Sequence, residues 1–131
     1  MTLNMVNPDD LGRPRGWSHG MLSPPGARIL FVAGMTAPDR PGFVQQFAGA
    51  LDNVLTVVRE AGGSPTDVGR LTIYTTDLEA YESNLKPLGE AYRERMGRHF
   101  PAMALVEVKR LVDPKAMVEI EATAAIPAEE A

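Results

Sequence analysis

The sequence predicts a single two-layer α+β domain, with a mixed sheet and two helices on one face of it. The chain has 131 residues, of which 44% are hydrophobic and 23% charged, so it is long enough to bury one core. Apolar residues recur at three- and four-residue steps between about 43 and 61, as on one side of a helix. Between 100 and 125 the side chains alternate in character, as they do in strands. The expected order is strand, strand, helix, strand, helix, strand, strand, which is typical of an α+β domain.

The N-terminal region is rich in residues that form turns. Residues 1–15 contain two prolines and a glycine, which predict an extended lead-in and not a helix. Residues 17–21 are a candidate short strand, a Ser-Pro-Pro-Gly turn follows at 23–26, and residues 28–33 are an almost continuous apolar strand. These features together predict a first hairpin.

Two helices are predicted, one before and one after a strand in the middle of the sequence. The first covers residues 43–61 and is followed directly by two glycines, which end it. Its apolar face consists of Phe43, Phe47, Leu51, Val54, Val58 and Ala61. A strand rich in β-branched residues is predicted for 68–76, and residues 77–83 connect it to a second helix at 84–98. Pro87 would lie in the first turn of that helix, where a missing N–H costs least.

A second hairpin is predicted for residues 100–125, with a short loop around Asp113 and Pro114. One face carries small and branched apolar residues that would pack on the helices: Ala102, Ala104, Val106, Val108, Val118, Ile120, Ala122 and Ala124. The other face mixes large apolar residues with three carboxylates, a cation and a threonine: Met103, Leu105, Glu107, Lys109, Met117, Glu119, Glu121 and Thr123. Residues 126–131 are predicted to be a flexible tail.

The mixed face of this hairpin has two interpretations. Burying unpaired charges is costly, so the face is not expected inside a monomer. Three large apolar side chains together are also unusual on a face that meets only water. A face half covered by another subunit, with a wet acidic recess left in it, satisfies both constraints. The alternative is a solvated strand face with incidental methionines.

Composition excludes several classes of function. The net charge of −4, with no run of lysine or arginine, argues against nucleic acid as the main partner. The absence of cysteine excludes disulfides, thiolate metal sites and cysteine nucleophiles. The N-terminal residues lack the apolar core of a signal peptide, and no apolar run reaches the length that spans a membrane. A soluble cytoplasmic protein is therefore expected.

Short motifs in a fixed order run through almost the whole chain. They are Asn7-Pro8, Gly16-Trp17-Ser18-His19, Phe31-Val32-Ala33-Gly34, Ala61-Gly62-Gly63, Phe100-Pro101-Ala102, Val106-Glu107-Val108 and Val118-Glu119-Ile120-Glu121-Ala122. This ordered set resembles the Rid family, the YjgF-type, RidA-like reactive intermediate deaminases.

The resemblance implies a chorismate-mutase-like fold and a homotrimer, with the sheets facing inward and three ligand-binding clefts between subunits. Deaminating members hydrolyse small imines and enamines to a keto acid and ammonia, without a metal or an organic cofactor. In them an arginine of a Pro-Ala-Arg motif binds the substrate carboxylate, a glutamate of the last strand positions water, and a tyrosine near the N-terminus closes the pocket.

This sequence departs from the family pattern at the arginine. The motif reads Pro101-Ala102-Met103, and a thioether cannot offer the planar fork of donors that binds a carboxylate. The resemblance thus implies a branch of the family that lacks the carboxylate-binding arginine. Trp17 stands at the tyrosine position and Glu119 is the retained glutamate. Asn84 is the nearest candidate for the family's asparagine at the start of the second helix, but its spacing to Phe100-Pro101 fits only with a gap.

Five residues are therefore candidates for the site. Glu119 is the candidate catalytic residue, which would orient or deprotonate a water; the alternative is an ion pair with another subunit, for example through Lys109. His19 could act as an acid or base or be structural. Trp17, Met103 and Leu105 are candidate apolar walls of a substrate site, or else interface packing.

A displaced cation could replace the arginine, and Lys109, Arg110 and Arg28 are the candidates. Three functions follow. The first is an imine or enamine hydrolase with altered substrate preference, and the second is a binding or regulatory trimer without chemistry. The third is a ribonuclease or translation inhibitor, as some family members are labelled, which the acidic balance disfavours.

Overall fold

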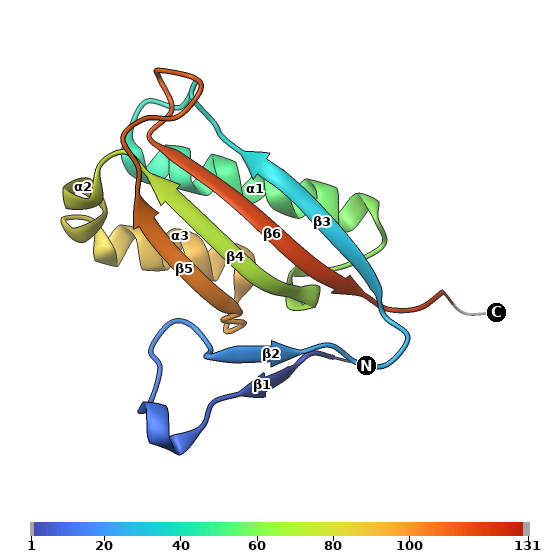
Figure 1. Ribbon diagram of the computed structural model, residues 1–131. Helices are drawn as coiled ribbons and strands as arrows, with labels where there is room; N and C mark the ends of the chain where they lie inside the picture. The colour runs from blue at the N-terminus through green and yellow to red at the C-terminus, as the bar shows by residue number, and fades with distance from the viewer. Residues whose placement is uncertain (1, 130–131) are drawn as a thin grey trace.

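The computed structural model describes residues 2–129, and its main body is a four-stranded sheet with helices on one face (Figure 1). The sheet order is β3-β6-β4-β5, and the elements beside the sheet are α1, α2 and α3. The bounds are β3 Arg28–Met35, α1 Phe43–Glu60, β4 Val68–Thr75, α2 Leu78–Glu82, α3 Leu85–Met96, β5 Ala102–Glu107 and β6 Val118–Ile126. The predicted two-layer α+β class is confirmed.

The core lies between the sheet and α1, as the helical periodicity predicts. Leu51, Val54 and Val58 of α1 are fully buried, and so are Val118 and Ile120 of β6. Each such side chain contributes roughly 1.5–3 kcal/mol by leaving water. The helix ends where the two glycines begin, because Gly62 takes up the left-handed backbone (φ +90°) that favours glycine.

The predicted second hairpin is wrong, because β4 lies between β5 and β6. β6 runs antiparallel to β4, whereas β5 runs parallel to it. A parallel pair needs a long crossover connection, and α2 and α3 supply it. The segment 108–117 therefore carries the chain past the end of β4, and it is not the tight turn of a hairpin (Figure 1).

The predicted first hairpin is wrong for a similar reason. The strand β2 (Gly20–Leu22) pairs with β1 (Asn4–Val6) inside the expected lead-in, and together they form a separate two-stranded ribbon. A short 3₁₀ turn at Asp9–Leu11 lies between them. β3 instead joins the edge of the main sheet through β6. Of the predicted tail, Ile126 ends β6 and is buried, and residues 130–131 lie outside the described part.

The connector predicted at 77–83 contains the short helix α2, which two carboxylates hold at its start. The Ala80 N–H donates to Asp77 Oδ1 at 2.9 Å, and the Leu78 N–H donates to Glu107 Oε1 at 3.0 Å. Pro87 is the third residue of α3, in the first turn as predicted. The Glu107 contact also shows that this side of β5 faces the helix layer.

Cross-strand register corrects the predicted faces of β5. Met103 lies opposite Leu71 and Leu105 opposite Ile73, and opposed residues point to the same side of a sheet. Since Leu71 and Ile73 are buried under the helices, Met103 and Leu105 face the helix layer. The prediction that they share a face with Glu119 is wrong.

Glu119 occupies the other face of the sheet. It lies opposite Tyr74, and Glu121 lies opposite Thr72, so these residues are on the face that the helices leave uncovered. We call this face the open face. Ala104 and Val106, which were expected against the helices, are also exposed on it. Among residues 2–129, no helix has the length and apolar character needed to cross a membrane.

Candidate functional site

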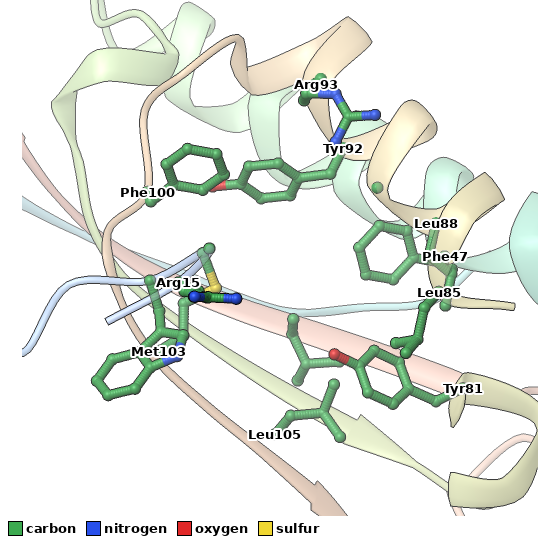
Figure 2. Close-up of a pocket in the computed structure, with 14 residues that line it drawn as sticks. Arg15, Phe47, Tyr81, Leu85, Leu88, Tyr92, Arg93, Phe100, Met103 and Leu105 are labelled. Carbon is green, nitrogen blue, oxygen red and sulfur yellow. The ribbon is translucent and has the colours of Figure 1, made fainter. Parts of the chain in front are cut away.

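A cavity, which we call the main cavity, lies between the β4–β5 end of the sheet, helices α1 to α3 and the segment before β2 (Figure 2). Its volume is about 620 Å³, which is within the usual range of ligand pockets. The lining residues are Arg15, Gly16, Trp17, Phe47, Ile73, Tyr81, Leu85, Leu88, Gly89, Tyr92, Arg93, Phe100, Met103 and Leu105.

Three of the five predicted site residues line this cavity. Met103 and Leu105 enter it from β5, and Trp17 enters from the N-terminal segment. That segment is anchored to the start of β5, because the Ser18 N–H donates to the Pro101 carbonyl at 3.1 Å and Ser18 Oγ donates to the Phe100 carbonyl at 2.6 Å. The anchor explains how a residue so early in the chain reaches the pocket.

One wall of the cavity is a pair of stacked rings. Tyr92 and Phe100 lie 5.4 Å apart between centroids, almost parallel. The Tyr92 hydroxyl donates to the His99 carbonyl at 2.5 Å, so it is used within the wall. Burial raises the pKa of Tyr92 far above its ordinary value, which keeps the hydroxyl neutral. This wall is therefore an apolar surface and not a proton donor to a ligand.

Two arginines, which the sequence did not single out, also line the cavity. Arg15 precedes Trp17, and Arg93 belongs to the last turn of α3. Neither has an ion pair within residues 2–129. Arg93 lies back over Gly89, since a methyl group built on Gly89 would be 3.1 Å from Arg93 Nη1. The predicted replacement cations do not line this cavity, and Arg28 instead pairs with Glu129 at 3.2 Å.

Glu119 lies on the open face, against a gap in the pairing of β3 with β6. The register of the two strands shifts between Val32 and Met35, and such bulges redirect nearby side chains. Gly34 lies in this bulge, where a methyl group on it would be 2.8 Å from the Glu119 carboxyl carbon. Gly34 thus leaves room for the carboxylate, for which the described residues provide no hydrogen bond or ion pair.

A neighbouring tyrosine and carboxylate are paired with each other. The Tyr74 hydroxyl donates to Glu121 Oε1 at 2.6 Å. This hydrogen bond raises the pKa of Tyr74, helped by burial and by the negative charges of Glu121 and Glu119. Glu121 is therefore engaged, whereas Glu119, two residues before it on the same face, is free to act on a water or a ligand.

The cavity and Glu119 are on opposite faces of one sheet. Met103 and Leu105 face the helices and Glu119 faces away from them. A single chain therefore cannot bring them to one ligand. A second copy, with its open face near this cavity, would combine the two groups.

His19 lies outside the main cavity. Its ring meets Trp17 edge-on with centroids 4.9 Å apart, and it lines a second cavity of about 380 Å³ beside β2 and β4. Its Nδ1 is buried and has no hydrogen-bond partner within the described residues. Asn84 is also not part of the main cavity, since its amide donates to the Ala80 carbonyl at 2.7 Å and joins α2 to α3.

Sequence reasoning missed most of the remaining lining residues. Leu85, Leu88 and Tyr92 belong to the second helix, which the sequence predicts, but their place in the cavity was not predicted. Arg15 gives no periodic signal, because it lies in an irregular segment. In the part of the chain that the structure describes, no group of three His, Asp or Glu side chains could hold a metal ion.

The fold and cavity define a small α+β protein with an apolar cavity at the edge of its helix layer, and three comparisons place it more closely. Residues 14–126 match the family described as Endoribonuclease L-PSP. A RutC family protein of Pyrococcus abyssi is 33% identical over 104 residues, which are 73% of this chain and 77% of the relative.

Solved structures agree with this match. YyfB from Yersinia pestis, a Rid family protein of unknown function, superposes with a TM-score of 0.80 and 27% identity over 96% of this chain and 100% of the other. TdcF from E. coli, solved with bound serine, gives 0.63 and 26% over 88% and 92%. The chain belongs to the Rid (YjgF) family, as its motifs predict.

Proposed function

We propose that this protein is a hydrolase of a small imine- or enamine-like metabolite, acting as a homotrimer with ligand sites in clefts between subunits. The observation that carries the proposal is the unpaired Glu119 carboxylate, which lies in the space left by Gly34 on an uncovered sheet face. A carboxylate in this state can take a proton from a water that attacks a substrate.

The open face supports assembly with further copies of the chain. Phe31 is 80% exposed, Ile29 52% and Val106 43%, which is unusual for a monomer in water. A second copy over this face would cover these side chains. It would also bring the cavity of one subunit toward Glu119 of the next, which a single chain cannot do.

The chemistry needs only water, a base and a binding site. Glu119 would accept a proton as the water oxygen attacks the carbon of the C=N bond. Glu119 then returns this proton to the nitrogen, which gives a carbinolamine. The C–N bond breaks as the hydroxyl group of the carbinolamine passes its proton to the departing nitrogen, which leaves a carbonyl compound and ammonia. The apolar cavity would hold the rest of the substrate and exclude bulk water. The proposal requires no cofactor, and this, like a cytoplasmic location, stays a prediction.

Substrate preference should differ from that of members with the arginine. Met103 offers no donor to a carboxylate, so 2-aminoacrylate, which has little besides its carboxylate to hold, should be a poor substrate. TdcF was solved with serine bound, and a small molecule with a carboxylate is the class that we propose here. The apolar lining favours a larger side chain on it.

The alternative is a trimer that binds a small molecule in the same clefts without chemistry. The specific observation in its favour is Met103 at the position of the family's arginine, in a cavity lined mostly by apolar side chains. An endoribonuclease function, which the family description suggests, is less well supported, since the net charge is −4 and phosphate backbones are held by basic surfaces.

Glu119→Gln tests the proposal, with Glu121→Gln as the matched control on the same strand face. Ammonia release would be measured with imines generated in situ from leucine and phenylalanine, beside 2-aminoacrylate. Glu119→Gln should lose roughly 10²–10⁴-fold in rate, the usual contribution of a general base. Glu121→Gln should lose much less. A wild type inactive on all three compounds, or a Glu119→Gln variant as active as wild type, would favour the binding trimer.

A further inference from the structure

The charge of the main cavity is opposite to that of the whole chain. The protein carries a net charge of −4, yet among the described residues two arginines and no acidic residue line the cavity. Neither arginine is neutralised by an ion pair there. A guanidinium presents a planar fork of donors that fits a carboxylate. The cavity is therefore suited to an anion and unsuited to a cation.

The rest of the lining is aromatic to an unusual degree. Five of the eight aromatic side chains of the chain, which has one tryptophan, three tyrosines and four phenylalanines, line this one cavity. An apolar cavity of about 150 Å³ already accommodates benzene, and this one measures about 620 Å³. A three-carbon acid would leave most of the wall without contacts, which forfeits dispersion energy.

The two arginines differ in how they meet the cavity. In Figure 2 the Arg15 side chain extends into the cavity on the side where Met103 lies, and Arg93 lies on another side of the cavity, beside Tyr92. Gly16, directly after Arg15, has a left-handed backbone (φ +77°), and Ser18 ties the segment to β5. The segment before β2 thus supplies the Arg15 guanidinium on the side of the cavity where β5 supplies the Met103 thioether.

We propose that this cavity selects a carboxylate that bears an aromatic or branched apolar body. Arg15 binds the carboxylate in place of the missing strand arginine, and Arg93 adds positive potential at the rim. The body of the ligand packs against Met103, Leu105 and the stacked pair of Tyr92 and Phe100. This inference names the substrate class of the proposed hydrolase and rests on that function for its role, but the binding can be measured without any turnover.

The single tryptophan makes the test specific to the site. Trp17 lines the cavity, so ligand binding can be followed by its intrinsic fluorescence and checked by calorimetry. The probes are 3-phenylpropanoate, its neutral amide and propanoate. We expect 3-phenylpropanoate to bind at least about ten-fold more tightly than either comparator, because each lacks one of the two recognised parts.

Variants then assign the cation. Arg15→Gln should weaken 3-phenylpropanoate about ten-fold and leave the amide unchanged, and Arg15→Lys should restore part of the loss. Arg98→Gln is the control, since Arg98 is exposed and lies outside the cavity. The inference is overturned if the amide or propanoate binds as well as 3-phenylpropanoate, or if Arg15→Gln binds it like the wild type.

The outcomes separate this inference from the proposed function. Selective binding of 3-phenylpropanoate without hydrolysis of any imine would support the ligand class and remove the hydrolase. Hydrolysis that depends on Glu119, with no preference for an apolar carboxylate, would support the hydrolase and overturn the ligand class.

Discussion

Gly34 limits what can lie beside the Glu119 carboxylate. A methyl group at position 34 would be 2.8 Å from the Glu119 carboxyl carbon and 2.9 Å from one carboxyl oxygen, which is closer than van der Waals contact. The backbone there is not in the left-handed region, so alanine would cause no backbone strain. The effect of a substitution should therefore fall on the position of the carboxylate.

Gly34→Ala should consequently reduce imine hydrolysis by at least about ten-fold, because small misplacements of a catalytic group are costly. Thermal stability should change little. Gly69→Ala in β4 is the control, since its methyl group would meet only ordinary contacts at 3.6 and 3.7 Å. Equal activity of both variants would show that the position of Glu119 does not matter for turnover.

At the scale of elements, Gln46 fixes α1 to two neighbouring segments. It is 3% exposed, and its amide nitrogen donates to the carbonyls of Arg40 at 3.3 Å and Lys115 at 3.1 Å. Its amide oxygen accepts from the Met117 N–H at 2.8 Å. One side chain thus provides hydrogen-bond partners for three backbone groups that lie outside the strand pairing of the sheet.

Gln46→Met keeps the size of the side chain and removes all three bonds. We expect it to lower the free energy of unfolding by about 2–4 kcal/mol, since buried backbone groups are left unsatisfied. Gln45→Met, at the exposed neighbouring position, should change it by less than about 0.5 kcal/mol. Urea denaturation of both variants would measure this, and similar losses would contradict the role of Gln46.

The link between α3 and β5 depends on Tyr92 and should respond to alkaline pH. Unfolded tyrosine ionises near about pH 10, and burial raises the pKa of Tyr92 in the folded protein well above that. A raised folded pKa means that the stabilisation is complete below about pH 10 and is lost as pH rises, by up to about 1.4 kcal/mol per pH unit.

Tyr92→Phe should remove this loss. At about pH 8 the variant should be less stable than wild type by about 0.5–1.5 kcal/mol, because the bond to the His99 carbonyl is gone. The difference should shrink between about pH 10 and 11, because ionisation of Tyr92 then stabilises the unfolded state of the wild type and the variant has no such group. Phe100→Leu removes the stacked ring but keeps Tyr92, so its loss of stability relative to the wild type should be the same at both pH values. A constant difference for Tyr92→Phe would refute the assignment.

The elements differ in how far the sequence could predict them. The first helix was placed within one residue of α1, because its period and its glycine stop are local properties. Strand pairing is not local, and both expected hairpins were wrong since β4 and β1 take the neighbouring places. On β5 both faces carry apolar residues, so alternation could separate the faces but not say which one the helices cover.

The candidate site was predictable in part for the same reason. Trp17, Met103, Leu105 and Glu119 came from motif positions, and the structure gathers the first three in one cavity. That Glu119 lies on the other face follows only from cross-strand register. Arg15 could not be found, because its place depends on the anchoring of Ser18 to residues about 80 positions later in the chain.

At the scale of the whole molecule, the separation of the cavity from Glu119 makes assembly a condition of the proposed function. The proposed reaction needs Glu119 of one subunit and the cavity of another. Disrupting the assembly should therefore abolish activity even if every residue of both groups is intact. This coupling distinguishes a trimer that completes the site from a trimer that only adds stability.

Phe31→Glu is the variant that tests this coupling. Phe31 lies on the open face opposite Thr123 and is 80% exposed, so in a monomer the substitution should have little effect on folding. In the trimer it would add a charge to a face that already holds Glu119 and Glu121, and uncompensated charge in an interface is costly. We expect sedimentation to show a shift from trimer to monomer, with hydrolysis falling in parallel. Val112→Glu, on the exposed β5–β6 connection, should leave both unchanged. A wild type that sediments as a monomer at micromolar concentration would show that the protein does not form the proposed trimer. A monomeric Phe31→Glu variant with full activity would show that one chain holds the complete site.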